Sequence, residues 1–144
     1  MASSGTLRLR VPDPEQRFRG VRLRPDIPIP GGSLDYRRRG GAWELTLPAP
    51  DADRFEYLVE LQDTDGGVET VPDPANPLRV GGAFGDKSVL ELPGYRRPRW
   101  LDRPGPGGER HDVAGTTVWQ APGLPAEEAA PLLVVHDGPE YDRL

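Results

Sequence analysis

Apolar and polar residues alternate one by one in several segments of the first 95 residues. Leu7, Leu9 and Val11, for example, are separated by two arginines. This period of two is typical of antiparallel strands that place one face on a core and the other in water. The pattern predicts six strands, over residues 7–11, 21–23, 43–47, 55–61, 68–71 and 88–92.

Turn-forming residues separate the predicted strands. Residues 28–32 read Pro-Ile-Pro-Gly-Gly, and Gly40 and Gly41 precede the strand at Trp43. Residues 63–67, Asp-Thr-Asp-Gly-Gly, predict a hairpin loop, because Asp and Gly tolerate the positive φ angles that tight reversals need. Residues 1–95 contain no convincing amphipathic helix pattern, so the region is predicted to be mainly β, a sandwich of two sheets.

The composition changes near Arg96. Residues 96–109 are rich in Arg, Pro and Gly, which predicts a linker. Beyond it, residues 110–115 predict a short extended segment and residues 116–121 a strand. Residues 131–138 form a continuous apolar run ending in a turn, which is typical of a strand buried on both faces in an α/β domain. Three short strands cannot cover both faces of a sheet, so we expect residues 110–144 to be the truncated start of such a domain.

The composition also excludes several kinds of site. The chain has no cysteine and two histidines, His111 and His136, so no disulfide framework and no zinc or iron site with the usual His and Cys ligands is expected. No run is apolar and long enough to span a bilayer, and the first eleven residues lack a signal-peptide core. We therefore expect a cytoplasmic protein without a membrane partner.

Charge is unevenly distributed along the chain, whose formal net charge is -5. Residues 1–39 carry nine arginines against four acidic residues, whereas residues 40–95 carry three basic and eleven acidic residues. The acidic balance argues against a nucleic-acid partner, which requires a basic face with interleaved aromatic residues.

Two stretches carry a family resemblance. The first is Val-Pro-Asp-Pro-Ala-Asn-Pro at residues 71–77, followed by Gly-Ala-Phe-Gly-Asp-Lys-Ser-Val-Leu-Glu-Leu-Pro-Gly-Tyr at residues 82–95. The second is Leu-Leu-Val-Val-His-Asp-Gly-Pro-Glu-Tyr at residues 132–141. In this order they resemble enterochelin-esterase-like proteins, in which an immunoglobulin-like, early-set β-sandwich precedes an α/β-hydrolase esterase domain. The resemblance implies a sandwich over residues 1–95, a linker over 96–109 and the first esterase strands over 110–144.

The resemblance also implies a chemistry. The family hydrolyses esters in ferric catecholate siderophores with a Ser-His-acid triad and without a cofactor, iron being part of the substrate. The nucleophile of such folds lies in a G-x-S-x-G elbow, which none of the four serines of this chain matches. We therefore expect an accessory domain that helps shape the substrate cleft, has no catalytic residue of its own and has the missing part of the esterase domain as its partner. The turn at Asp137 and Gly138 would supply one oxyanion-hole amide or be a plain strand-ending turn.

A few residues are candidate substrate contacts. A ferric triscatecholate is a trianion, so Arg37, Arg38 and Arg39 could attract it, although a solvated loop is the favoured interpretation. Trp100, in the predicted linker, could stack on a ligand or pack against the sandwich. Trp119 is predicted to lie in a core. No metal site is expected, because the acidic residues near Asp63 lack the spacing of a calcium loop.

Two other functions remain open at this point. Early-set domains also precede the catalytic domains of branching enzymes, which suggests a glycan-binding module. Such a module needs an exposed pair of aromatic residues on one sheet face, whereas Trp43 and Tyr57 fall on the apolar, buried phase of their strands. A structural interaction domain without any ligand is the third possibility. The adjacent His111 and Asp112 would point to opposite faces of a strand, so they do not suggest a catalytic pair.

Overall fold

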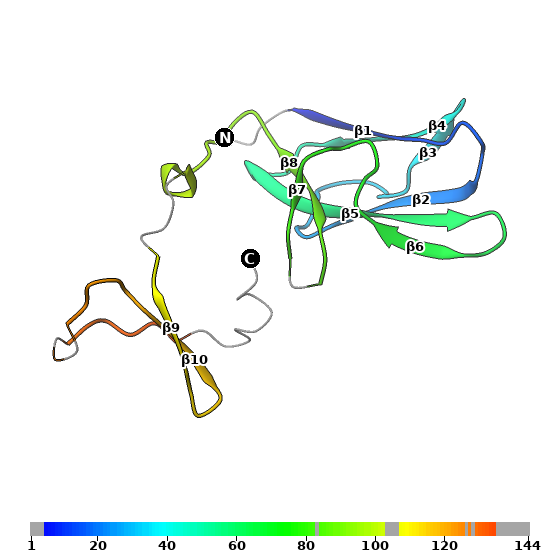
Figure 1. Cartoon of the computed structure of the whole chain (residues 1–144). Coiled ribbons are helices and arrows are strands. Elements are labelled where there is room, and N and C mark those ends of the chain that lie inside the picture. Colours follow the sequence, from blue (N-terminus) through cyan, green and yellow to red (C-terminus); the bar gives the residue numbers. More distant parts are fainter. Residues whose placement is uncertain (1–4, 83, 103–106, 126, 128, 135–144) are drawn as a thin grey trace. The chain divides into compact units, whose positions relative to one another are not determined.

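The computed structural model describes residues 5–82, 84–102, 107–125, 127 and 129–134. The chain divides into two compact units, Met1–Tyr95 and Arg96–Leu144. The first unit consists of antiparallel strands (Figure 1). These strands are β1 (Thr6–Pro12), β2 (Phe18–Pro25), β3 (Arg37–Arg39), β4 (Ala42–Pro48), β5 (Arg54–Asp63), β6 (Val68–Val71), β7 (Arg79–Val80) and β8 (Lys87–Glu91).

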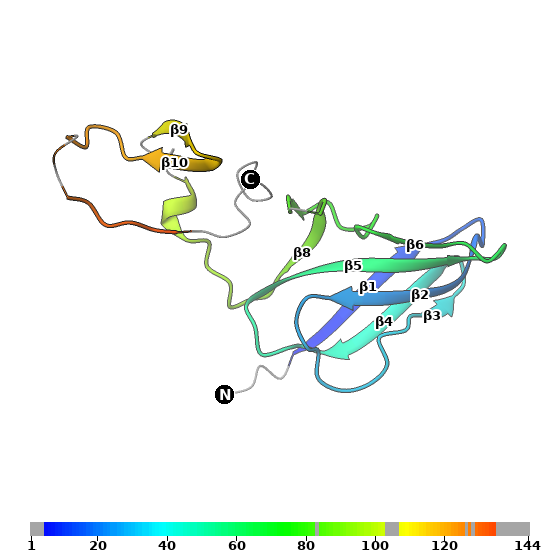
Figure 2. The ribbon, with the colours of Figure 1, turned by 90° about the horizontal axis from the view of Figure 1, so that it is seen from below.

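The strands of the first unit form two sheets. One sheet has the order β1-β4-β3, and the other has the order β2-β5-β8-β7, with β6 also paired to β5. Figure 1 shows β1 and β4 in a layer above β2, β5 and β6, and the turned view of Figure 2 looks onto the faces of these layers. The six strands predicted from alternation are confirmed as β1, β2, β4, β5, β6 and β8. The predicted hairpin loop is confirmed between β5 and β6, where Gly66 has a φ of 102°.

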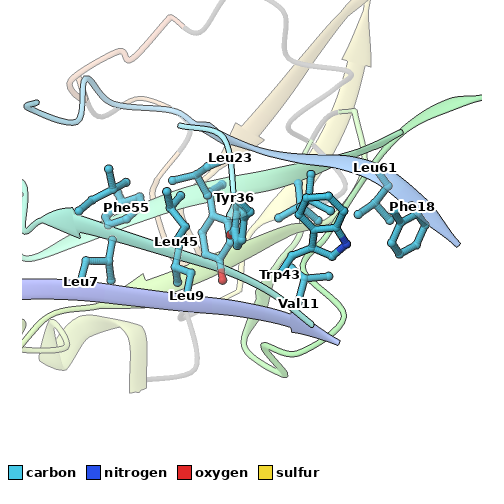
Figure 3. Packing of buried hydrophobic residues seen from close by; sticks show 14 residues of the cluster. Leu7, Leu9, Val11, Phe18, Leu23, Tyr36, Trp43, Leu45, Phe55 and Leu61 are labelled. Atoms are coloured by element: carbon cyan, nitrogen blue, oxygen red, sulfur yellow. The ribbon is translucent and has the colours of Figure 1, made fainter. Parts of the chain in front are cut away.

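The core lies between the two sheets and is filled by the apolar phase of four strands. Burial alternates strictly along β1 and along most of β4 and β5, as expected for strands with one face in water. Figure 3 shows how Trp43 and Tyr36 lie among the aliphatic side chains. The buried cluster consists of Leu7, Leu9, Val11, Phe18, Val21, Leu23, Tyr36, Trp43, Leu45, Leu47, Phe55, Tyr57, Val59 and Leu61.

One segment belongs to both sheets. In residues 33–39, which we call the strap, the Leu34 carbonyl accepts the Leu23 N–H (2.9 Å), and the Tyr36 N–H bonds to the Val21 carbonyl (2.8 Å). Both of these bonds attach the strap to β2. The next three residues form β3 and pair with β4 in the opposite sheet. The strap therefore crosses from one layer to the other at one side of the sandwich.

The second unit is described by itself. It contains a short 3₁₀ helix, η1 (Arg99–Asp102), within the predicted linker, and a hairpin of β9 (Glu109–Val113) and β10 (Thr116–Gln120). Ala114 and Gly115 have φ angles of 50° and 81°, which suit a tight two-residue hairpin turn. The described residues of the chain include no helix that is long and apolar enough to cross a membrane.

Two predictions for the second unit were wrong. Trp119 is 59% exposed rather than buried, because the hairpin has two strands and all but one of its strand residues are exposed. Of the predicted strand at residues 131–138, residues 135–138 lie outside the described part; residues 131–134 form no strand, and Leu132 and Leu133 are more than 80% exposed. A strand buried on both faces needs neighbours on both sides, and the described residues provide none for this run.

Candidate functional site

Arg37, Arg38 and Arg39 form strand β3 rather than the predicted solvated loop. β3 lies opposite β4, with Arg38 facing Trp43 and Arg37 facing Glu44. Because side chains alternate along a strand, Arg38 lies on the core side and its two neighbours lie on the outer side. Three successive charges show no polarity alternation, so the pattern did not reveal this strand. The structure thus separates the three candidates into two different environments.

Arg38 has a structural role. Its guanidinium lies over the Trp43 ring, 4.6 Å from the ring centroid, and its Nη2 lies 3.4 Å from Asp13 Oδ2. Nη2 also donates to the carbonyl of Phe18. A guanidinium that stacks on one residue and bonds two others is committed to the fold. We therefore remove Arg38 from the candidate substrate contacts.

Asp13, which sequence reasoning missed, organises the turn after β1. It is 2% exposed and accepts hydrogen bonds from the N–H of Arg17 (2.7 Å), the N–H of Phe18 (3.3 Å) and the indole Nε1 of Trp43 (3.0 Å). Burial alone raises the pKa of this carboxyl. The three hydrogen bonds and the charge of Arg38 outweigh burial and hold the pKa below the ordinary value of 3.8. The available signal was an Asp-Pro pair at the end of a predicted strand.

Four exposed arginines share the outer face of the β1-β4-β3 sheet, and we call them the arginine face. They are Arg8, Arg10, Arg37 and Arg39. Glu44 lies among them, with its Oε1 3.9 Å from Arg10 Nε. Within the described part of the chain, the other three arginines have no ion pair. Four guanidinium groups are thus offset by one carboxylate on this face, and such an excess of cations attracts anionic partners.

A hollow of about 600 Å³ adjoins the arginine face. It is lined by residues of β4, of β3 and of the segment before β3: Glu44, Leu45, Thr46, Leu47, Pro48, Arg37, Arg39, Gly31, Gly32, Ser33 and Asp35. We call it the β4 hollow. Its volume lies within the range typical of ligand clefts, roughly 300–1,000 Å³.

The two acidic residues that line the β4 hollow, Glu44 and Asp35, each have an arginine partner, and that of Glu44 is Arg10 at 3.9 Å. The Asp35 carboxylate accepts a hydrogen bond from Ser33 Oγ (2.7 Å) and pairs with Arg22 Nη1 (2.6 Å). The hydrogen bonds from Ser33 and Arg22 lower the pKa of Asp35, so it is ionised at neutral pH and satisfied by Arg22. Among the charged residues that line the hollow, Arg37 and Arg39 are therefore the ones without an ion pair in the described part of the chain.

A second, smaller hollow of about 370 Å³ lies beside the loop from Asp73 to Arg79. Asp73 is 2% exposed. Its Oδ2 accepts the Tyr57 hydroxyl (2.9 Å), its Oδ1 accepts the Ala75 N–H (2.8 Å), and its own N–H donates to Ser88 Oγ (2.8 Å). The loop is fastened to β5 and β8 by these bonds. We call residues 73–79, with Tyr57 and Ser88, the Asp73 corner.

Asn76 and Arg79 complete the Asp73 corner. Asn76 Nδ2 donates to the Tyr57 hydroxyl (3.1 Å) and to the Val89 carbonyl (2.7 Å). Arg79 Nη2 donates to the Asp73 carbonyl (2.6 Å), and its Nη1 donates to Ser88 Oγ (3.0 Å). Burial raises the pKa of Tyr57 above its ordinary value of 10.0, so its hydroxyl stays protonated. A network in which each of these groups already has a partner stabilises the fold and leaves no group poised for catalysis.

The remaining candidates are placed only in part. Trp100 belongs to η1 in the second unit, and its side chain lies outside the described part, as do Asp137 and Gly138. The oxyanion-hole hypothesis therefore stays a prediction. Of the described serines, Ser33 bonds to Asp35, and Ser88 belongs to the Asp73 corner.

No metal centre or His-Asp contact appears among the described residues. No group of three or more His, Cys, Asp or Glu side chains comes together there. His111 Nε2 lies 3.7 Å from Glu109 Oε2, on the same side of β9, and Asp112 is engaged by Thr117 Oγ1 at 2.9 Å. His111 and Asp112 therefore have different partners, as adjacent strand residues that point to opposite faces do.

Comparison with known proteins gave no assignment: no family model matches the chain, and no curated protein matches it.

Proposed function

We propose that the chain is the non-catalytic front part of an enterochelin-esterase-like serine hydrolase. In this proposal the first unit is an immunoglobulin-like, early-set sandwich, and the second unit is the start of the α/β-hydrolase domain. The observation that carries the proposal is the Asp73 corner. The residues on which the resemblance rests, 71–77 and 82–95, include Asp73, Asn76 and Ser88 of this corner and the strand β8 to which it is fastened. The resemblance thus involves a structural feature of the sandwich rather than scattered identities.

The proposed contribution of the sandwich is electrostatic. A ferric triscatecholate carries three negative charges, and the arginine face offers a local excess of guanidinium groups. Guanidinium groups are weakly hydrated and bind planar anionic groups well. The face would raise the concentration of the substrate near an adjoining catalytic domain, and the attraction would weaken as salt is added.

Equilibrium dialysis of the chain against a ferric triscatecholate tests this role. We expect salt-sensitive binding that Arg39→Glu weakens by about fivefold or more, because the substitution both removes a cation and adds an anion. The matched control is Arg19→Glu, which makes the same charge change at an exposed residue of β2 in the other sheet. Equal losses in the two variants would show that net charge alone is responsible and would contradict a specific role of the face.

An ester assay tests the non-catalytic part of the proposal. The chain is expected to give no sustained turnover of p-nitrophenyl esters, because neither described serine has a histidine partner. Turnover that persists after repeated purification would contradict the proposal.

The glycan-binding alternative receives no support from the described strands. Trp43 and Tyr57 are 6% and 0% exposed. The outer faces of both sheets, over the strands that the structure describes, carry charged, polar and aliphatic side chains and no aromatic ring. Retardation of the chain in gels containing maltodextrin would nevertheless favour this alternative over the esterase proposal.

A further inference from the structure

Strand β4 is paired along only part of one edge. It has seven residues, and β1 pairs with all of them, but β3 pairs only with Ala42, Trp43 and Glu44. Beyond Glu44, the edge of β4 that faces away from β1 borders the β4 hollow. An unpaired strand edge of this kind is a template for an added strand.

The register fixes which backbone groups face the hollow. The Asp13 N–H bonds to the Gly41 carbonyl (2.8 Å), and the Ala49 N–H bonds to the Gly5 carbonyl (2.9 Å). Hydrogen-bonded and non-bonded pairs alternate in an antiparallel ladder, so the odd-numbered residues of β4 bond to β1. The N–H and C=O of Thr46 therefore point toward the hollow. Thr46 is exposed and lines it.

Charge indicates the kind of segment that would fit. Arg37 and Arg39 line the hollow and have no ion pair among the described residues, whereas the two carboxylates that line it are paired, Asp35 with Arg22 and Glu44 with Arg10. A strand added beside Thr46 would continue the line of β3, with its outer-face side chains next to Arg37 and, one outer-face position farther along, Arg39. Acidic side chains at those positions would pair with them, and basic ones would be repelled.

The geometry points to a peptide-binding site: the β4 hollow accepts an extended acidic segment of another protein, which adds to β4 as an antiparallel strand next to β3. Main-chain bonds to Thr46 supply affinity, and Arg37 and Arg39 supply the preference for acidic side chains, as is usual when a peptide extends a sheet. This site uses the backbone edge of β4, so it does not depend on the proposed esterase parentage.

Fluorescence polarisation with a labelled, end-blocked peptide of alternating valine and glutamate tests the site. We expect salt-sensitive binding, little binding of the matching valine-lysine peptide, and a loss of about tenfold on Thr46→Pro. Proline removes the N–H that faces the hollow and leaves the ladder to β1 intact, which is the arrangement in which an edge strand tolerates proline. Thr46→Val keeps the N–H and should bind as the unchanged chain does.

A second measurement needs no variant of the protein. Only every second N–H of an added strand faces β4, so two peptides are compared, one N-methylated at its odd-numbered residues and one at its even-numbered residues. One of these two peptides should lose binding and the other should not. Equal effects in the two peptides, or loss with Arg39→Glu but not with Thr46→Pro, would overturn strand addition in favour of a simple anion site. Self-association of the chain in sedimentation experiments that is abolished by Thr46→Pro would instead make a second copy the occupant and would also overturn the proposal.

Failure of this proposal is distinguishable from failure of the proposed function. Binding of the ferric triscatecholate requires the arginine face but no backbone N–H, so Thr46→Pro should leave it unchanged. We expect Arg39→Glu to weaken the binding of both the ferric triscatecholate and the peptide. We expect Thr46→Pro to weaken the binding of the peptide alone.

Discussion

Two buried tyrosine hydroxyls have opposite environments. Tyr57 is fully buried and bonds to both Asp73 and Asn76. Tyr36 is 4% exposed, and its hydroxyl finds no hydrogen-bond partner among the described residues. Burial raises the pKa of both phenols above the ordinary value of 10.0, so each is neutral at neutral pH. A neutral hydroxyl without a partner costs free energy, whereas one with two partners contributes to stability.

Removal of the two hydroxyls is therefore expected to have opposite signs. Tyr36→Phe should leave the free energy of unfolding unchanged or raise it by about 1 kcal/mol, because a desolvated, unpaired group disappears. Tyr57→Phe should lower it by about 1–3 kcal/mol, because Asp73 loses a donor in a buried site. Urea unfolding followed by circular dichroism measures both. Destabilisation of equal size in the two variants would mean that the Tyr36 hydroxyl has a partner.

The turn between β1 and β2 depends on one ionised carboxylate. Asp13 gathers two backbone N–H groups, the Trp43 indole and Arg38 around a buried charge. Its pKa in the folded protein lies below the ordinary value of 3.8. Its contribution to stability is therefore fully present above that ordinary value and is lost as the pH falls through the lower, folded value.

Asp13→Asn should lower the free energy of unfolding by about 1–3 kcal/mol at neutral pH, because an amide keeps the shape but gives up the charge that the donors surround. The difference between the variant and the unchanged chain should shrink as the pH falls below the ordinary value of 3.8 and through the lower, folded pKa of Asp13, because the unchanged chain then loses the same contribution. Asp35→Asn, at an exposed carboxylate whose pKa is also lowered, is the control and should have a smaller effect. A difference that does not change with pH would show that the charge of Asp13 is not its source.

Elements with alternating polarity were predictable, and the others were not. β1, β4 and β5 each bury one face, so apolar and polar residues alternate in their sequences and predict the strands. β3 and β7 are short and lie at sheet edges, where pairing by the backbone needs no particular side-chain pattern. The same limit applies to the candidate site: an Arg triplet is visible in a sequence, but its division between Arg38 and its neighbours requires the register with β4.

The two units of the chain differ in how much of their apolar surface is buried. The first unit has a core that combines both of its sheets. The described part of the second unit has a two-stranded hairpin whose strand residues are almost all exposed, including Val113 at 59%. An isolated hairpin of this size is marginally stable in water. The apolar run at residues 131–134 is exposed as well, and its sequence alone did not reveal whether a neighbouring strand would cover it.

Hydrogen exchange should therefore separate the two units. Backbone amides of β5, which pairs with strands on both sides, are expected to exchange slowest, because they open only on global unfolding. Amides of residues 109–120 are expected to exchange by local opening at rates close to those of an unstructured peptide. Mass spectrometry after proteolysis measures both regions in one sample. Strong protection of the hairpin in a monomer would contradict this expectation and would mean that its strands are covered by another part of the chain.

The strap has a consequence for any rearrangement of the chain. Because residues 34 and 36 bond to one sheet and residues 37–39 to the other, a break or an insertion at that point disturbs β3 in one layer and the bonds to β2 in the other at once. New chain ends or an inserted domain would be tolerated far better in the exposed turn at residues 63–67, which joins neighbours within one sheet. The sandwich can thus be permuted or used as a carrier at its hairpin tips, but its crossing point must stay continuous.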